Sequence, residues 1–390
     1  MRSNPKIGGF VEPGFEPCLD AFERNFAECA ELGAACAVYR DGKPLLDVWA
    51  GVARSDDGCP WTEDTVVPVF SVTKGIAAIC VLSLVSRGLV DLDAPLARYW
   101  PEFGLHGKDR ITVRESLAHR AGVPVIDGSI TVADLVDTEK MSRRLAAQPP
   151  LFEPGSDHLY HALTIGWITS ELVRRTTGLP LGEWFRLNVA EPYGLNIQIG
   201  RTAGDAAPIA AVEVPVDRDT PQLDADLIPA RAISLNGLFP ARMSGLADAL
   251  NSPAFQQVEL AGGNGLADAR SLARLYGLVL GGDDIRPLIS SACLAAACEA
   301  VSAGPQFGTD LPGPTWGTGF MLPWSVQPML GPGSFGHDGA GGSLAFAHAP
   351  SGVSFAYVRN QTGIPNTEDA HVYRVVRALA ECLDISIPCY

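Results

Sequence analysis

The 390-residue sequence has few lysines, no long apolar run and no paired cysteines, and each absence excludes a class of protein. Five lysines, no basic cluster and a formal net charge of −15 argue against a nucleic-acid partner. No apolar segment approaches the roughly 18 residues that a membrane-spanning helix needs. The nine cysteines include no Cys-x-x-Cys pair, which favours reduced thiols over a disulfide framework or a zinc site.

Three further signatures are missing. No Gly-x-Ser-x-Gly segment occurs, which excludes an esterase of the α/β-hydrolase type. The seven histidines show no His-Glu-x-x-His spacing, so we expect neither a metal nor a cofactor. The first nine residues contain no apolar stretch of the kind found in secretory signal peptides. We therefore expect a cytoplasmic protein.

Strand-like patterns lie near both ends of the chain, whereas residues 75 to about 300 are rich in helical patterns and loops. The expected strands are residues 35–40 and 44–52, which flank the turn Asp41-Gly42, and residues 318–322, 336–348 and 352–359. The expected helices are residues 18–32, 76–85, 131–147, 163–177, 266–280 and 368–383, with a short helix after the capping box of Thr112 and Glu115.

This distribution predicts an α+β fold in which both chain ends build one antiparallel sheet, flanked by the terminal helices. Residues 1–74 and 315–390 would form this α/β domain, and residues 75–314 a large, mostly helical domain. We expect the active site at the interface of the two. The glycine cluster at residues 262–265 is not a phosphate loop, because no Lys-Ser/Thr pair follows it. It predicts a turn whose backbone passes close to another element.

Ser71 and Lys74 stand three residues apart at the start of the apolar segment 76–85. In a helix this spacing points both side chains to one face. A serine hydroxyl is a weak nucleophile, but a buried, neutral amine can take its proton while it attacks a carbonyl. The alternative is a helix-capping serine followed by a surface lysine. A second Ser-x-x-Lys spacing, at residues 3–6, contains a proline and is unsuited to a helix.

Two other segments complete a pattern with Ser71 and Lys74: Tyr160-His161-Ala162, and the run His-Asp-Gly-Ala-Gly-Gly at residues 337–342. In this order they resemble the three motifs of the serine β-lactamase and penicillin-binding-protein superfamily, which are Ser-x-x-Lys, Tyr-x-Asn and Lys-Thr-Gly. Within that superfamily the chain most resembles class C β-lactamases and family VIII carboxylesterases. The resemblance extends along most of the chain and implies the β-lactamase/transpeptidase-like fold.

The resemblance implies that Ser71 is the nucleophile, that Lys74 is the activating amine and that Tyr160 relays the proton to the leaving group. A tyrosine near an ammonium group can itself act as a base. Which of Lys74 and Tyr160 takes the first proton stays open at this point.

The resemblance also assigns residues 337–342 to a strand beside the nucleophile. It implies that the backbone N–H groups of Ser71 and Ala340 form the oxyanion hole, with His337 and Gly339 in the substrate-binding segment. In isolation, the glycine-rich run is equally typical of a plain turn or bulge.

Two departures from the motifs bear on the substrate. Ala162 stands where the lactamases have an asparagine that holds an acylamino group. His337 stands where they have a lysine that binds the β-lactam carboxylate, and Asp338 replaces the hydroxyl residue after it. Histidine is only partly charged near neutral pH, and Asp338 adds a negative charge beside it. Efficient β-lactam hydrolysis is therefore not expected.

The sequence as a whole predicts a cytoplasmic serine carboxylesterase that cleaves small esters of short-chain acids through an acyl-serine intermediate. Weak β-lactamase side activity is expected from the shared mechanism. The alternatives are a β-lactamase, a D-aminopeptidase or an acyltransferase of the same fold, and a binding protein without turnover. We expect His119, His158 and His161 to be structural or to line the pocket rather than to catalyse.

Overall fold

Ten strands form one antiparallel sheet in the computed structural model, which describes residues 5–29, 31–202, 207–215, 227–239, 243–281, 287–310, 312–362 and 370–387. Across the sheet the strands follow the order β1 (Gly8–Val11), β3 (Lys43–Arg54), β2 (Gly33–Arg40), β13 (Val353–Arg359), β12 (Leu344–His348), β11 (Ser334–Asp338), β10 (Met321–Leu322), β9 (Pro312–Trp316) and β8 (Ser302–Pro305), and β4 (Cys59–Pro60) pairs with β3. The pairing of β2 with β13 joins the two ends of the chain, as the sequence predicts.

A two-residue turn forms the β2–β3 hairpin. Asp41 and Gly42 both have positive φ angles, of 50° and 76°. This combination is a type I′ turn, whose twist matches that of the strands it connects. The expected hairpin around Asp41-Gly42 is therefore confirmed.

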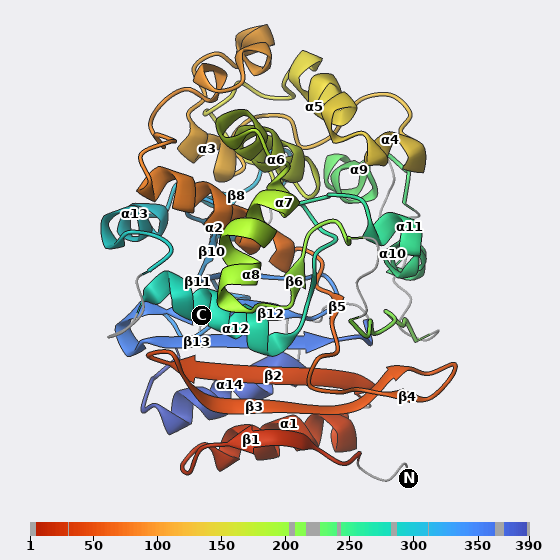
Figure 1. The fold of residues 1–390 in the computed structure, drawn as a ribbon. Helices are drawn as coiled ribbons and strands as arrows, with labels where there is room; N and C mark the ends of the chain where they lie inside the picture. Colours follow the sequence, from red (N-terminus) through yellow and green to blue (C-terminus); the bar gives the residue numbers. More distant parts are fainter. Residues whose placement is uncertain are drawn as a thin grey trace.

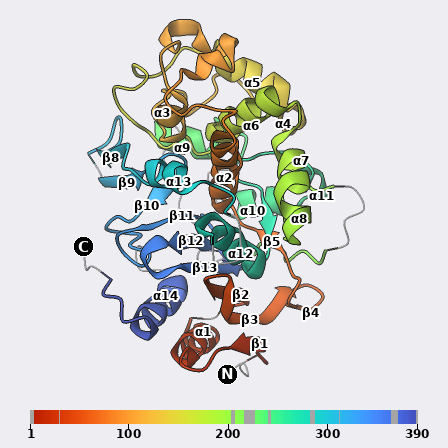
Figure 2. The ribbon, with the colours of Figure 1, turned by 60° about the vertical axis from the view of Figure 1, so that its left-hand side comes forward.

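Helices cover both faces of the sheet (Figures 1 and 2). The terminal helices α1 (Glu16–Glu28) and α14 (Ala370–Cys382) pack on one face, and α12 (Ala269–Leu280) packs on the other. Along β13, Phe355 and Tyr357 belong to the core on the side of the terminal helices, whereas Ala356 and Val358 belong to the core on the side of α12. Burial on both faces explains why β13 is apolar without alternation.

The remaining helices form the upper part of the molecule in Figure 1, around the central helix α2 (Val72–Ser86). They are α3 (Val113–Leu117), α4 (Val132–Val136), α5 (Thr138–Ala147), α6 (Thr164–Thr177), α7 (Leu181–Phe185), α8 (Glu191–Tyr193), α9 (Ile228–Ser234), α10 (Met243–Asn251), α11 (Pro253–Gln256) and α13 (Ser291–Ala297), with 3₁₀ turns at Leu96–Arg98, Pro101–Gly107 and Ala349–Ser351 and a π-turn at Arg186–Ala190. A small sheet of β5 (Val67–Pro68), β7 (Leu266–Ala267) and β6 (Ile197–Gln198) lies among them.

Most expected helices form close to their predicted bounds, and the capping box of Thr112 and Glu115 is present. The helix expected at residues 131–147 is instead two helices, because the Asp137 side chain accepts a hydrogen bond from the Lys140 N–H and starts α5 anew. The pattern at residues 266–280 begins as strand β7. Asp268 then caps α12.

The sheet begins earlier in the C-terminal half than expected. Strand β8 starts at Ser302, before the expected boundary at residue 315. Helix α12 also lies inside the expected helical segment but packs on the sheet. The expected strand at residues 318–322 is shortened to β10. The division of the chain into residues 1–74 with 315–390 and residues 75–314 stays a prediction.

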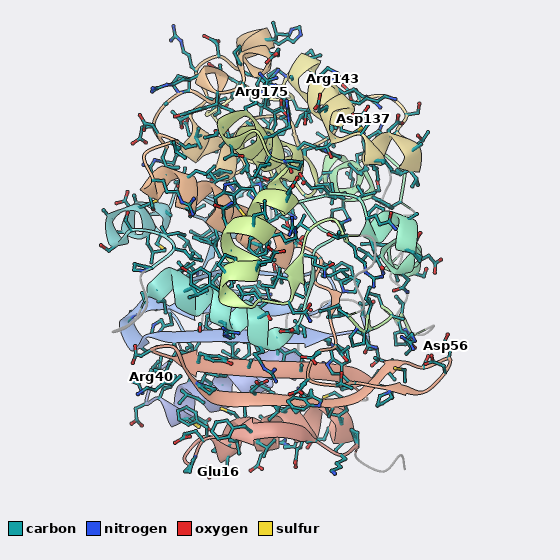
Figure 3. The ribbon with its side chains drawn as sticks, viewed as in Figure 1. Glu16, Arg40, Asp56, Asp137, Arg143 and Arg175 are labelled. Atoms are coloured by element: carbon teal, nitrogen blue, oxygen red, sulfur yellow. The ribbon has the colours of Figure 1, made fainter. Side chains whose placement is uncertain are left out.

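Charged side chains are spread over the outside of the molecule, as the labelled residues in Figure 3 illustrate. Among the described residues, no helix combines the length and the apolar character that crossing a membrane requires. The eight cysteines in the described ranges are all free thiols.

Candidate active site

Ser71 immediately precedes α2 and follows a strained residue. Phe70 has a positive φ of 51°, which is rare for a bulky side chain. Such strain clusters at functional sites, where the surrounding structure holds it. Ser71 is partly exposed, although the helix after it is buried from Val72 to Leu84. The turn at Phe70 therefore presents a hydroxyl at the end of a rigid, buried helix.

Two proton donors converge on this hydroxyl. Lys74 Nζ lies 2.9 Å from Ser71 Oγ, one helical turn further along α2. The Tyr160 hydroxyl lies 3.0 Å from the same oxygen, although Tyr160 is 89 residues away in the sequence. The structure thus places the three residues that the sequence predicts as catalytic within hydrogen-bond distance of one oxygen.

Lys74 is 4% exposed, and it also donates to the carbonyl oxygen of Gly262 at 2.5 Å. Burial lowers the pKa of Lys74 from its usual 10.5 to about 7, although the Asp338 carboxylate opposes the shift. A large share of molecules therefore carries a neutral amine at neutral pH. Lys108 is also buried, but it donates to two backbone carbonyl groups. The contact with Ser71 is what distinguishes Lys74.

The Tyr160 ring stacks on Trp316, with ring centroids 5.3 Å apart and planes within 8° of parallel. The Lys74 Nζ lies 4.9 Å from the centroid of the Tyr160 ring. Burial raises the pKa of Tyr160 well above its usual range, more than the hydrogen bond to Ser71 lowers it. The phenol therefore stays protonated at neutral pH, and its O–H group donates a hydrogen bond to Ser71 Oγ.

Two buried histidines hold the loop that carries Tyr160. The backbone N–H of His161 donates to His119 Nδ1 at 3.1 Å, and that of Val123 donates to His161 Nε2 at 3.1 Å. Burial lowers the pKa of both imidazoles, to about 4 for His161, so both are neutral. The His119 ring also packs edge-on against those of Tyr160 and Trp316. These histidines therefore position Tyr160, in the structural role that the sequence favours.

Glycines let the segment after β11 approach the start of α2. A Cβ atom on Gly339 would lie 2.5 Å from a backbone carbonyl oxygen in the segment before Ser71, and one on Gly341 would lie 2.5 Å from the Phe70 ring. Ala340 stands between these glycines and is exposed. Within the described part of the chain, the backbone N–H groups of Ser71 and Ala340 donate to no other residue. Such unpaired donors are what an oxyanion hole requires.

His337 and Asp338 line different cavities, because neighbouring residues on a strand point to opposite faces. His337 is 1% exposed, and its Nδ1 donates to the Asp338 carbonyl oxygen at 2.7 Å. Its Nε2 has no hydrogen-bond partner among the described residues. With Lys74 and His119 it lines an internal cavity of about 10 Å³, the size of about one water molecule. His337 thus faces the internal cavity beside Lys74, whereas Asp338 faces the side of Ser71 on which the active-site cleft opens.

A cleft of about 230 Å³ opens at Ser71. Aromatic side chains and one carboxylate form much of its wall. It is lined by Ser71, Tyr160, Gln306, Pro314, Trp316, Met321, Trp324, Asp338 and Ala340. Sites for drug-sized ligands occupy roughly 300 to 1,000 Å³, so this cleft suits a small substrate.

Several site residues carry no motif in the sequence. Gly262, which accepts from Lys74, was signalled only by its glycine cluster, and a Cβ there would lie 2.6 Å from the Leu163 carbonyl oxygen. Gln306 accepts from the Tyr160 N–H at 2.8 Å. Of the cleft residues, Gln306 follows β8, Trp316 ends β9 and Trp324 follows β10. No residue spacing in these segments indicates a catalytic or binding role. Only the folded sheet brings them to Ser71.

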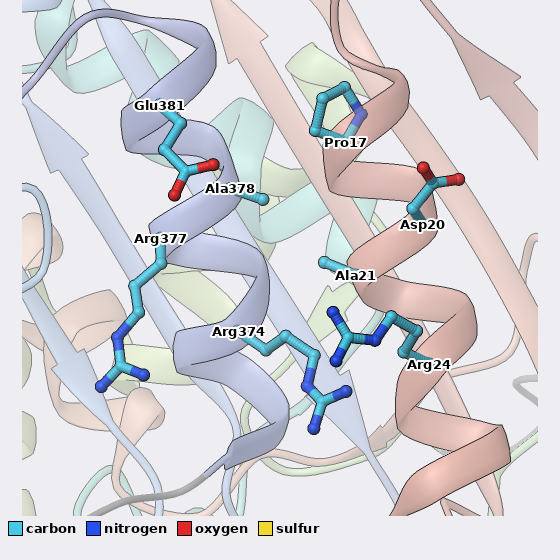
Figure 4. A pocket seen from close by; sticks show the side chains of 8 residues that line it. All are labelled: Pro17, Asp20, Ala21, Arg24, Arg374, Arg377, Ala378 and Glu381. Carbon is cyan, nitrogen blue, oxygen red and sulfur yellow. The ribbon is translucent and has the colours of Figure 1, made fainter.

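A larger cavity of about 500 Å³ lies between α1 and α14 (Figure 4). Its charged side chains include Asp20, Arg24, Arg374 and Glu381. Arg24 and Arg374 both pair with Glu28, the former at 2.8 Å. The pair of Arg374 with Glu28 connects the two terminal helices. No serine, cysteine or histidine is among the described residues that line this cavity.

Comparison with known proteins relates the chain to one family. The profile of the family described as Beta-lactamase matches residues 19–380. The esterase/beta-lactamase LipL of Mycobacterium tuberculosis is 34% identical over 389 aligned residues, which cover 96% of this chain and 89% of LipL. The structure of a family VIII carboxylesterase superimposes with a TM-score of 0.86 at 31% identity, over 97% of this chain and 100% of its own. A penicillin-binding protein homologue from Caulobacter crescentus covers the same shares with a TM-score of 0.85 at 32% identity.

Proposed function

This chain belongs to the beta-lactamase family, and from that premise we propose that it is a serine carboxylesterase that hydrolyses small esters of short-chain acids through an acyl-Ser71 intermediate. The observation that carries the proposal is the convergence of the Lys74 amine and the Tyr160 hydroxyl on Ser71 Oγ, at 2.9 and 3.0 Å. The similarity to LipL, which is named an esterase, and to a family VIII carboxylesterase supports ester hydrolysis.

Lys74 is the general base for acylation. Burial moves the pKa of the amine down to about 7 and that of the Tyr160 phenol up, so the amine is the group able to accept a proton at neutral pH. Ser71 Oγ attacks the ester carbonyl carbon while its proton passes to the Lys74 amine. A C–O bond forms and the carbonyl oxygen becomes an oxyanion, which the N–H groups of Ser71 and Ala340 stabilise.

Collapse of this intermediate breaks the C–O bond to the alcohol. Tyr160 gives its proton to the departing oxygen and receives the proton held by the Lys74 ammonium, so the alcohol leaves neutral and both side chains are restored. A water molecule then attacks the acyl carbon and gives a proton to Lys74. Ser71 Oγ departs with that proton, and the free acid is released.

The wall of the cleft favours esters over β-lactams. Ala162 carries a methyl group where the related motif has an amide; it is 6% exposed and is not among the described residues that line the cleft, so this position offers no hydrogen bond to an acylamino group. Asp338 adds a carboxylate to the cleft, where it repels the carboxylate that a β-lactam carries. A β-lactam is therefore a poor substrate, although acyl transfer through Ser71 leaves room for slow turnover.

The proposal is tested by comparing turnover of p-nitrophenyl butyrate and a chromogenic cephalosporin. We expect the ester to be preferred and Ser71→Ala to lose activity on both. Ser83→Ala is the matched control, because Ser83 is buried in the same helix and its hydroxyl has no partner among the described residues. Strong preference for the cephalosporin, or full ester turnover by Ser71→Ala, would contradict the proposal.

We place the protein in the cytoplasm, with a small-molecule ester as its partner and no nucleic acid. The support is the net charge of −15, which repels polyanions, and the free thiols of the eight described cysteines, which suit a reducing compartment. Fractionation of cells that express the native gene checks the location.

A further inference from the structure

The described residues that line the cleft at Ser71 give it a negative charge. Asp338 is the single charged residue among the described residues that line the cleft, and its side chain is 33% exposed. Lys74 lines the small cavity behind Ser71 instead. We infer that the cleft selects esters whose alcohol part carries a positive charge, such as an amino alcohol or a quaternary ammonium alcohol. The inference rests on the proposed ester hydrolysis and specifies its substrate class.

A neutral amide fixes the Asp338 carboxylate without cancelling its charge. Gln327 Nε2 donates to Asp338 Oδ2 at 3.0 Å. The other end of this amide accepts from the Tyr373 hydroxyl at 2.5 Å, which orients its NH₂ group toward the carboxylate. His337 Nδ1 donates to the backbone carbonyl of Asp338 at 2.7 Å and lies 3.4 Å from the carboxylate. The carboxylate is thus held in place and available to a cation.

The alcohol part of the substrate lies on the side of Asp338. Tyr160 gives its proton to the departing alcohol oxygen, and it lines the same cleft as Asp338. The charge of Asp338 also raises the pKa of both Tyr160 and Lys74, the two groups that exchange protons with Ser71 and the departing alcohol. A cation a few atoms from the alcohol oxygen therefore comes close to Asp338.

Aromatic rings flank the same part of the cleft. Trp316, Trp324 and Tyr160 all contribute to its wall, and the first is stacked on the last. The faces of such rings attract cations, most strongly when the site excludes water. Aromatic rings beside a carboxylate suit an ammonium group that also carries apolar methyl or methylene groups.

An anionic alcohol part has no counterpart in the cleft. No lysine or arginine is found among the described residues of its wall. The net charge of −15 also lowers the local concentration of anions and raises that of cations around the protein. The charge of the cleft and the net charge of the protein therefore both favour a cationic substrate over an anionic one.

Three butyrate esters of equal size test the inference: butyrylcholine, its neutral analogue with carbon in place of nitrogen, and an analogue with a carboxylate at that position. Release of butyric acid is followed by pH-stat titration. We expect kcat/KM of the cationic ester to exceed that of the neutral ester by about tenfold, with the anionic ester lowest. In Asp338→Asn, which still accepts from Gln327, the ratio of cationic to neutral ester should fall toward one.

Asp20→Asn is the control, because it changes the net charge equally but lies on α1, at the cavity beside α14 (Figure 4). It should leave the ratio of cationic to neutral ester as in the wild type. Equal kcat/KM for the two esters in the wild type, or an unchanged ratio in folded Asp338→Asn, overturns the inference and leaves ester hydrolysis standing. Turnover of none of these esters and none of p-nitrophenyl butyrate removes the proposed function, and this inference with it.

Discussion

The amine of Lys74 donates a 2.5 Å hydrogen bond to the carbonyl oxygen of Gly262, which lies 188 residues further along the chain. A carbonyl oxygen can accept a hydrogen bond from a neutral amine and from an ammonium group. The bond therefore holds Nζ beside Ser71 Oγ in both protonation states. Lys74 can take up and release a proton during catalysis without moving.

The pH dependence of ester hydrolysis should report the Lys74 amine. Burial lowers the pKa of Lys74 to about 7, so the amine is protonated and inactive as a base below this pH, and free above it. We expect kcat/KM for p-nitrophenyl butyrate to rise with pH through about 7 and then level off. Initial rates read at the isosbestic wavelength of p-nitrophenol check this. A flat profile through neutral pH would move the proton acceptor to another group.

Lys74→Met should abolish turnover and change how stability depends on pH. The unfolded lysine keeps its proton up to its usual pKa of 10.5, whereas the folded one loses it near 7. Between these pH values, unfolded wild-type protein binds more protons than the folded protein does. The free energy of unfolding of the wild type therefore rises by up to about 1.4 kcal/mol per pH unit. The variant lacks this gain. Urea unfolding of both proteins at about pH 7 and pH 9 should show that the free energy of unfolding rises with pH by more in the wild type than in the variant. An equal change in both proteins would contradict the prediction.

Tyr160→Phe should harm alkyl esters more than p-nitrophenyl esters. The variant lacks the proton that an alkoxide needs on departure, whereas p-nitrophenolate departs without one. We expect kcat to fall by about 10² to 10⁴ for an alkyl ester and by less for p-nitrophenyl butyrate. Tyr276→Phe is the matched control, since the Tyr276 hydroxyl is buried without a partner among the described residues. Equal losses on both esters would indicate that Tyr160 only positions Ser71.

The sequence predicts the parts of this protein that local spacing encodes. Ser71 and Lys74 meet because they are one helical turn apart, and the Asp41-Gly42 turn sets its own hairpin. Strand register decides that His337 lines the internal cavity and Asp338 lines the cleft, since a shift of one residue would exchange the faces of the sheet to which they point. A motif cannot supply that register. It arises from the pairing of β11 with β12 and β10.

Local spacing in the sequence does not predict the wall of the cleft either. Trp316 in β9 and Trp324 after β10 line the same cleft as Tyr160, and no local spacing relates them to it. The resemblance to known motifs identified the reacting groups, which recur at fixed positions. It did not identify the residues that contact the rest of the substrate. Those depend on long-range packing, which sets the shape and charge of the cleft.

Gly341→Ala should lower kcat without unfolding the protein. Its Cβ would lie 2.5 Å from the Phe70 ring, so the ring or the strand must shift, and either shift displaces the Ala340 N–H relative to Ser71. Loss of one oxyanion donor lowers kcat by about 10² to 10³, with a smaller effect on KM. Gly277→Ala is the control, because it adds a methyl group inside α12 against the Ser354 hydroxyl alone. Steady-state kinetics and thermal melts of both variants check this: an unchanged kcat in folded Gly341→Ala would show that the oxyanion does not depend on the position of Ala340.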